Sequence, residues 1–493
     1  MKTDIHQGSA AVAQHTEPAN YAPVTFQPGQ GVRLSWMVGL IAVHAVLGIL
    51  CEESRWVGFA HGLGTLAFGL YLVFAGRPRY QIAYWAAYAV GAEVLWRLSR
   101  APLPWEYGKY AVSLVLLAAF LRSVKRGFPW IPVVYFVLLL PAVAQTLYEV
   151  PSKLAKDFIS FYLSGPFCMA VCALFFSQLE LDSARLQRLI SWLVFPVAST
   201  AAAALFGLGT SESIEFGSGS NFAASGGFGP NQVSAILGLG ALYLVLMALS
   251  LRLGKWLRLA AVLIAVWFCA HAVLSFSRTG IYLFGAGLLV AAPFLSLHRL
   301  LHPLTLVGAC LAIIAGLSAW TYLERFSGGK LGQRFANVDL TGRDRIARQD
   351  LELWQKNMVF GVGIGMSGLE RDEVGGTRVA AHTEYTRLLA EHGLLGIVAL
   401  VLLLAAAALN VLRRRPSYAK PVMIAGTAWA MLYLAISGMR TAAPAFLIGL
   451  GLARATALPI LTARRRRGVG PVLAAPAIRG PVVKAEGWNT QQG

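Results

Sequence analysis

The main pattern in this chain is a series of uninterrupted apolar runs separated by short polar segments. The runs are 16 to 22 residues long, close to the roughly 20 residues that a helix needs to cross the hydrocarbon core of a bilayer. They are continuously apolar and do not alternate, which favours helices over barrel strands. The pattern predicts 14 spans, near 34–50, 56–75, 80–97, 107–121, 129–148, 158–178, 187–208, 230–251, 256–275, 279–297, 303–322, 393–411, 420–437 and 441–460. Because one pair could be re-entrant or lie on the surface, we expect an all-α polytopic membrane protein with 12–14 transmembrane helices.

The polar segments divide the chain into five parts. We expect a disordered cytoplasmic tail over 1–32, a transmembrane bundle over 33–322, a large loop over 323–392, C-terminal transmembrane helices over 393–460 and a basic cytoplasmic tail over 461–493. The loop is far too long for a simple connection, and loops of this length usually carry function or are disordered. Its composition favours order, because apolar residues recur at helical spacing between Asp344 and Phe360, at Ile346, Leu351, Trp354 and Met358.

Composition supports the membrane class and orients the chain. Hydrophobic residues make up 57% and charged residues 13%, against about 25% charged in soluble domains. The net charge of +19 falls largely in short clusters between apolar runs, which is typical of cytoplasmic loops and argues against nucleic-acid binding. An even number of spans then leaves both termini in the cytoplasm and places the loops 209–229 and 323–392 on the far side.

The sequence contains no evident signal for a metal or a cofactor. The five cysteines lie in or beside apolar runs, without CxxC or metal-ligand spacing to histidine. No DxD signature occurs in the far-side segments, and the nearest pattern, Asp350-x-Glu352, is expected on a helix surface. The glycines of 360–365 have no βαβ context and are expected to form a tight turn. We therefore expect neither a metal nor a cofactor.

His382 is the first candidate for chemistry. It comes just before a stretch, 383–396, that leads from the polar loop into an apolar run. If Thr383 begins a helix, the helix dipole disfavours the imidazolium of His382 and keeps the ring a neutral proton acceptor. That state suits a general base near neutral pH. A capping or interfacial role explains the residue equally well.

Three arginines are candidates for binding an anion. Arg278, between two spans, either snorkels to the interface or binds an anion. Arg343 and Arg345 open the loop helix, where guanidinium groups and free backbone N–H groups together suit a phosphate. A solvated face with Asp344 as local partner is the alternative for these two.

Charged residues inside the spans are few. Glu93 and Arg97 lie one helical turn apart and are expected to form a buried structural pair, with the lining of a substrate cavity as the alternative. A cation-coupled transporter would usually carry more acidic or broken-helix positions at mid-membrane. The chain places its polar residues at one face, which favours surface chemistry on a lipid-borne substrate over transport.

Taken together, three blocks resemble the O-antigen ligase and O-antigen polymerase superfamily of bacterial envelope glycosyltransferases. They are SRTG at 277–280, the segment from 341–343 to the glycines of 360–365, and the stretch from His382 to Gly396. The likeness covers about a quarter of the chain. Two positions depart from the family pattern, which often has Asn where this chain has Thr383 and Trp where it has Ala347.

The resemblance implies a GT-C-like fold and an enzyme of the bacterial inner membrane. It would transfer a glycan from undecaprenyl diphosphate to an acceptor hydroxyl on the periplasmic face, and in ligases the acceptor is the lipid A–core oligosaccharide. His382 would be the catalytic base, while Arg278, Arg343 and, less directly, Arg345 would bind the diphosphate without a metal. Direct attack would invert the anomeric centre.

The same blocks leave other functions open. An O-antigen polymerase or a protein O-oligosaccharyltransferase would share them, and a lipid-linked glycan flippase is the alternative from another class. The sequence also does not assign roles to four further basic residues on the far side, Arg97, Arg100, Lys153 and Arg440.

Overall fold

The computed structural model describes residues 32–122, 128–210, 219–251, 253–296, 300–301, 303–337, 342–373, 383–412 and 417–455. Almost all of its regular structure is helical, and the all-α polytopic fold predicted from the sequence is confirmed. The helices of the first half are α1 Leu34–Glu53, α2 Arg55–Phe74, α3 Arg79–Leu98, α4 Tyr107–Leu121, α5 Trp130–Val137, α6 Pro141–Glu149, α7 Ser152–Ser177, α8 Ser183–Gly209 and α9 Pro230–Ser250.

The second half contains the loop helices and the C-terminal helices. They are α10 Lys255–Leu274, α11 Arg278–Ala291, α13 Pro303–Phe326, α14 Lys330–Ala336, α15 Arg343–Lys356, α16 Ser367–Glu373, α17 Glu384–Leu412, α18 Lys420–Ser437 and α19 Ala442–Leu450. Two 3₁₀ turns, η1 Ala223–Ser225 and η2 Ala292–Phe294, and two short parallel strands, β1 Glu180–Leu181 and β2 Arg454–Ala455, complete the described elements.

Each predicted span coincides with a helix or a helix pair. Nine helices of the described chain, with α5 and α6 counted together, are long and apolar enough to cross a membrane, and three shorter apolar helices are Tyr107–Leu121, Arg278–Phe294 and Lys420–Ile436. Several helix ends differ from the predicted spans. α7 begins at Ser152 and α17 at Glu384, both earlier than predicted, α13 continues to Phe326, and α19 ends at Leu450. A nine-residue helix is only about 14 Å long, and after it the chain pairs with β1 instead of remaining helical.

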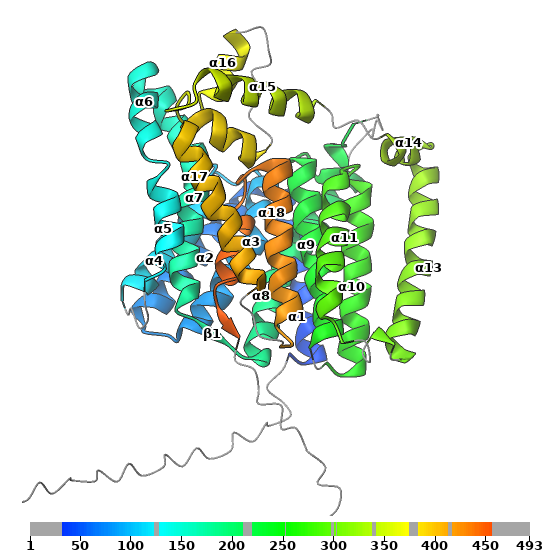
Figure 1. Cartoon of the computed structure of the whole chain (residues 1–493). Coiled ribbons are helices and arrows are strands. Elements are labelled where there is room, and N and C mark those ends of the chain that lie inside the picture. The colour runs from blue at the N-terminus through cyan, green and yellow to red at the C-terminus, as the bar shows by residue number, and fades with distance from the viewer. Residues whose placement is uncertain are drawn as a thin grey trace, which may run out of the picture. The chain divides into compact units, whose positions relative to one another are not determined.

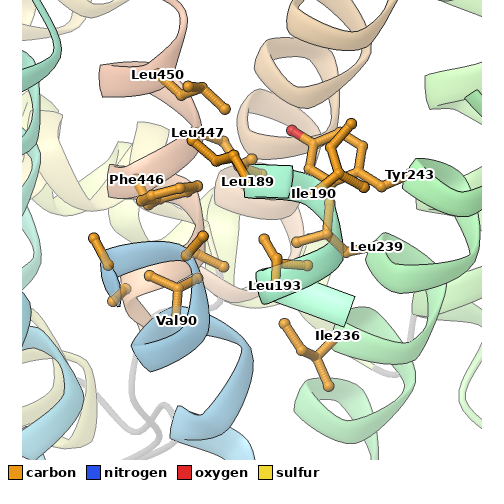
Figure 2. Packing of buried hydrophobic residues seen from close by; sticks show 14 of the residues in the cluster. Val90, Leu189, Ile190, Leu193, Ile236, Leu239, Tyr243, Phe446, Leu447 and Leu450 are labelled. Atoms are coloured by element: carbon orange, nitrogen blue, oxygen red, sulfur yellow. The ribbon is translucent and has the colours of Figure 1, made fainter. Parts of the chain in front are cut away.

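The core lies where α3, α8, α9 and α19 meet (Figure 2). In the most apolar 18-residue segments of α8 and α9, 83% and 89% of the residues are buried inside the protein. These helices are therefore central and do not face the lipid. Side chains from all four helices interdigitate there, among them Val90, Leu189, Ile190, Leu193, Ile236, Leu239, Tyr243, Phe446, Leu447 and Leu450. This packing gives the helix ends that carry polar side chains a rigid support.

Figure 1 shows the two ends of the bundle clearly. α14, α15 and α16 lie at one end, which we call the loop end, and β1 lies at the opposite end. The first described residues, at the start of α1, line the same cavity as the start of α8, which directly follows β1. The two ends of the described chain therefore lie together, opposite to the loop helices, as an even number of spans requires.

Candidate active site

Arg278 begins α11, and the start of this helix is fastened to the start of α9. The side chain of Ser277 caps α11 and donates a hydrogen bond to Asn231 Oδ1 at 2.7 Å. The backbone N–H of Gly280 donates to Ser234 Oγ at 3.0 Å, and a Cβ at this glycine would collide with the backbone of Ser234. The SRTG block thus lets two helices approach closely and places Arg278, half-buried, at the loop end.

A second arginine, which the sequence did not indicate, lies beside this helix start. Arg334 of α14 is buried and donates from Nε to the carbonyl oxygen of Phe276 at 3.2 Å. Phe276 has a φ of 58°, a left-handed conformation that is unfavourable for a bulky residue. Arg278 in turn donates to the carbonyl oxygen of Asn337, the C-cap of α14. These contacts hold α14 over the start of α11.

Arg343 is the residue on which the basic side chains converge. It begins α15 after Gly342, whose φ is 75°, and it is half-buried. Burial lowers the pKa of the Arg343 guanidinium, and the positive charges of three nearby arginines lower it further. The three are Arg278, Arg440 and Arg334. Four guanidinium groups from α11, α14, α15 and the turn between α18 and α19 therefore come together at the loop end.

The position of Arg440 follows from a buried ion pair. Glu93 and Arg97 of α3 pair at 2.7 Å, as predicted, with side chains only 1% and 5% exposed. Arg97 donates both to the carbonyl oxygen of Arg440 at 2.8 Å and to Gln232 Oε1 at 3.1 Å. Because Gln232 follows Asn231, which holds Ser277, one network joins the backbone of Arg440 to the start of α11.

Two more contacts from α3 and α4 hold the same turn. Glu93 accepts the backbone N–H of Ala442 at 2.6 Å, and Lys109 donates to the carbonyl oxygen of Met439 at 3.0 Å. Lys109 is fully buried and also pairs with Glu106. The turn carrying Arg440 is therefore fixed by buried charges on two separate helices.

The loop helix α15 is attached to α17 through Asp350. This carboxylate is fully buried, pairs with the buried Arg371 of α16 and accepts a hydrogen bond from Thr386 Oγ1 at 2.8 Å. Burial raises the pKa of Asp350, while its contacts with Arg371 and Thr386 oppose that shift. The prediction that Asp350 lies on a helix surface was wrong, because its partner lies 21 residues further along the chain.

The buried face of α15 also differs from the predicted one. Ile346, Asp350 and Leu353 are buried, whereas the predicted apolar positions Leu351 and Met358 are 37% and 48% exposed. The helix ends at Lys356, four residues before the predicted end at Phe360. Asp350 is buried with its partner Arg371. The buried face of α15 is therefore rotated by part of a helical turn from the face that the hydrophobic pattern predicts.

The start of α17 contains a second buried charge group. Arg387 pairs with Glu384 and, at 2.6 Å, with Glu391, and all three side chains are at most 4% exposed. Glu391 also accepts a hydrogen bond from Ser367 Oγ at 2.9 Å. This group, which we call the α17 triad, ties α16 to the first turns of α17.

A glycine-rich turn packs against α17. Gly361, Gly363 and Gly365 all have positive φ, and backbone N–H groups of Val362 and Gly363 donate to carbonyls of α17 at 2.9 and 3.2 Å. Gly393, with φ 55°, kinks α17 at this contact, where a Cβ would lie 2.5 Å from the carbonyl oxygen of Val359. The expected tight turn is confirmed, and it fits against the kink.

His382 lies outside the described residues, and the structure describes the chain again from Thr383. α17 begins at Glu384, and Thr383 Oγ1 accepts the backbone N–H of Tyr385 at 3.3 Å. Thr383 is thus the capping residue, and the helix starts one residue later than expected. A hydroxyl can serve this capping role as an amide can, which accounts for Thr where Asn is frequent.

The remaining basic candidates lie apart from the arginine cluster or have internal roles. Arg345 is exposed on α15, and residues two apart on a helix do not share a face, so it is not grouped with Arg343. Arg97 is engaged in the buried network, while Arg100 and Lys153 are exposed. Within the described ranges, no group of three His, Cys, Asp or Glu side chains could hold a metal ion.

Sequence reasoning therefore found part of the cluster. Arg278 and Arg343 were singled out, and the structure brings them together with Arg334 and Arg440. Arg334 has no motif around it, and Arg440 lies in a short turn between two apolar helices. The charged pair of α3 was a signal that could have led to Arg440, because buried charges need polar partners from elsewhere in the chain.

A comparison with known protein families matches part of the chain. The family model described as O-antigen ligase matches residues 263–401, a segment that contains the start of α11, the loop helices and the first part of α17. No curated protein matched the chain. Residues 263–401 thus match the O-antigen ligase family model, and this match supports the resemblance of the chain to the O-antigen ligase superfamily.

Proposed function

We propose that this protein is an O-antigen ligase, which transfers a glycan from undecaprenyl diphosphate to the lipid A–core oligosaccharide at the periplasmic face of the bacterial inner membrane. The observation that carries the proposal is that Arg278, Arg334 and Arg440 lie near Arg343 at the loop end, where hydrogen bonds of Arg278 and Arg334 join the start of α11 to α14. Like charges repel, and a diphosphate would offset this repulsion while accepting paired hydrogen bonds from guanidinium groups. Both termini would then lie in the cytoplasm.

The proposed reaction is a direct displacement at the anomeric carbon. The acceptor hydroxyl attacks that carbon as His382 takes its proton, and the bond between carbon and the diphosphate oxygen breaks. The leaving undecaprenyl diphosphate keeps the electron pair, and the arginines stabilise its developing charge. A single attack from the opposite side inverts the anomeric centre. Because the guanidinium groups supply the positive charge, we propose that transfer does not depend on a metal.

The arginine cluster lies close to the start of α17. The turn that carries Arg440 contacts the start of α17, since a Cβ at Gly438 would lie 3.2 Å from Glu384 Oε2. Glu384 is two residues beyond His382 in the sequence. The turn that carries Arg440 and the start of α17, which follows the proposed base in the sequence, are therefore neighbours at the loop end.

Reconstitution of the purified protein tests this function. We expect the wild-type protein to join undecaprenyl-diphosphate-linked glycan to lipid A–core with EDTA present, and the His382→Ala variant to lose at least about 100-fold in rate. Unchanged transfer by the variant would remove His382 from the chemistry. Activity that vanishes with EDTA and returns with magnesium would contradict the metal-free mechanism, and transfer by the purified protein would exclude a flippase as the explanation.

An O-antigen polymerase, or a protein O-oligosaccharyltransferase, is the second candidate, because these enzymes share the matched domain. A clean deletion strain distinguishes them. Loss of all lipopolysaccharide-attached O-antigen supports the ligase. Persistence of single-repeat caps without long chains would instead support the polymerase.

Arg440 supplies a separate prediction. We expect Arg440→Ala to lower transfer by tenfold or more, with partial recovery in Arg440→Lys, because Lys lacks the bidentate fork. The hydrogen bond from Arg97 to the backbone oxygen of Arg440 is kept in this variant, so the turn should stay in place. Lys153→Ala, an exposed basic residue at the start of α7, is the matched control and should stay active. Full activity of Arg440→Ala would exclude it from the donor site.

A further inference from the structure

A second basic site lies at the end of the bundle opposite to the loop end. The starts of α1, α3 and α8 surround a cavity of about 750 Å³. Three arginines line it, together with aromatic, aliphatic and small polar side chains. Its lining includes Arg33, Arg185, Arg188, Asp182, Tyr80 and Trp192. None of them takes part in the arginine cluster around Arg343.

The charges of this cavity favour an anion. The lining contains three arginines and one carboxylate, and its net charge is therefore +2. Asp182 is already used, because it caps α8 by accepting the backbone N–H of Arg185 at 2.7 Å and pairs with the Arg185 side chain at 3.3 Å. The Arg185 guanidinium also lies 4.7 Å above the ring of Tyr80. The charges of Arg33 and Arg188 are therefore not balanced by the lining.

A mostly apolar groove adjoins the cavity. It has a volume of about 460 Å³, lies against α2, α3 and α8, and shares Trp192 with the basic cavity. Phe68 and Leu72 of α2 form part of its wall, and Phe68 is 56% exposed on the apolar surface of the bundle. A polar site at the helix starts thus continues into a groove for an apolar chain.

We propose that this pair of cavities binds an anionic phospholipid, with its phosphate between Arg33 and Arg188 and one acyl chain in the groove along Trp192. The aromatic residues at the joint suit the membrane interface, where such side chains are enriched. Basic pockets between transmembrane helices bind anionic headgroups elsewhere for the same electrostatic reason. A free phosphate would fill the basic cavity alone and leave the groove without an occupant. The site does not depend on the transfer reaction proposed above.

Lipid binding by full-length protein in neutral detergent tests the proposal. Phosphatidylglycerol is titrated and bound lipids are counted by native mass spectrometry, with phosphatidylcholine as the neutral lipid. We expect tighter binding of phosphatidylglycerol, and a loss of roughly 30-fold in Arg33→Gln/Arg188→Gln, as two arginine–headgroup attractions predict. This variant keeps Asp182 and Arg185, and therefore the cap of α8. Equal binding of both lipids, or no loss in the variant, would overturn the proposal.

Two further variants separate the headgroup from the chain. Gly64→Leu should weaken phosphatidylglycerol binding without touching the arginines, because Gly64 lines the groove and nothing lies within 4 Å of its added Cβ. Lys255→Gln/Arg258→Gln, at the start of α10, removes two charges from the same end of the bundle and should bind normally. If inorganic phosphate raises the melting temperature as much as phosphatidylglycerol does and Gly64→Leu has no effect, the site binds an anion and not a lipid.

Discussion

Arg343→Ala is expected to abolish glycan transfer while the protein still folds and inserts into the membrane. Loss of one preorganised donor for transition-state charge typically costs about 10²–10³ in rate. In this site the effect should reach that range, because Arg343 is the point on which three other guanidinium groups converge. Removing it also relieves like-charge repulsion, so the melting temperature should stay equal or rise. A coupled measurement of transfer rate and melting temperature checks both expectations.

The controls for this variant come from the same helix and from α11. Arg345→Ala, on the exposed face of α15, should retain activity, whereas Arg278→Ala should lose it to the same degree as Arg343→Ala. Lysine at 278 or 343 should restore only part of the rate. An inactive Arg345→Ala variant would show that the diphosphate is bound along the outer face of α15. An active Arg343→Ala variant would remove the arginine cluster from the mechanism.

Arg387→Met is expected to have the largest effect on stability. The variant leaves Glu384 and Glu391 buried without their shared partner. Removing one member of a buried ion pair costs about 3–5 kcal/mol, and two carboxylates lose their counter-charge here. We therefore expect a large fall in melting temperature and in monodisperse yield in detergent.

A neutral replacement of the α17 triad separates charge from packing. In Glu384→Gln/Arg387→Met/Glu391→Gln no uncompensated charge stays buried, and folding should recover relative to Arg387→Met. Transfer should remain impaired, because the triad positions the start of α17 beside the proposed base. A triple variant no more stable than Arg387→Met would show that the triad acts through packing and hydrogen bonds, such as that of Ser367 with Glu391.

Most of the fold could be predicted because membrane helices are encoded locally. A spanning segment must satisfy its backbone hydrogen bonds internally, so a continuous apolar run indicates a helix without knowledge of its neighbours. The predicted spans coincide with helices for this reason. α19 is the exception. Its residues are apolar because they are buried among protein helices, and the chain then leaves the helix to pair with β1.

The site was less predictable, and Asp350 shows why. Charged residues lie two positions before and after it in the sequence, which suggested a solvated helix face, yet it is fully buried against Arg371 and Thr386. Arg440 illustrates the same difficulty. Its place is set by Arg97, 343 residues earlier in the chain. Residue spacing along the sequence indicates neither Arg371 as the partner of Asp350 nor Arg97 as the partner of Arg440.

The sequence alone determined that this is a helical membrane protein, that its polar residues gather in one long loop, and that Arg278 and Arg343 are candidates for binding an anion. These features follow from hydropathy and residue type, which act over one or two helical turns. Only the tertiary structure decided that Arg334 and Arg440 join Arg343, that Arg345 lies apart, and that buried ion pairs attach the loop to the bundle. Charges interact through space, and a buried charge is stable only beside a partner that the fold brings to it.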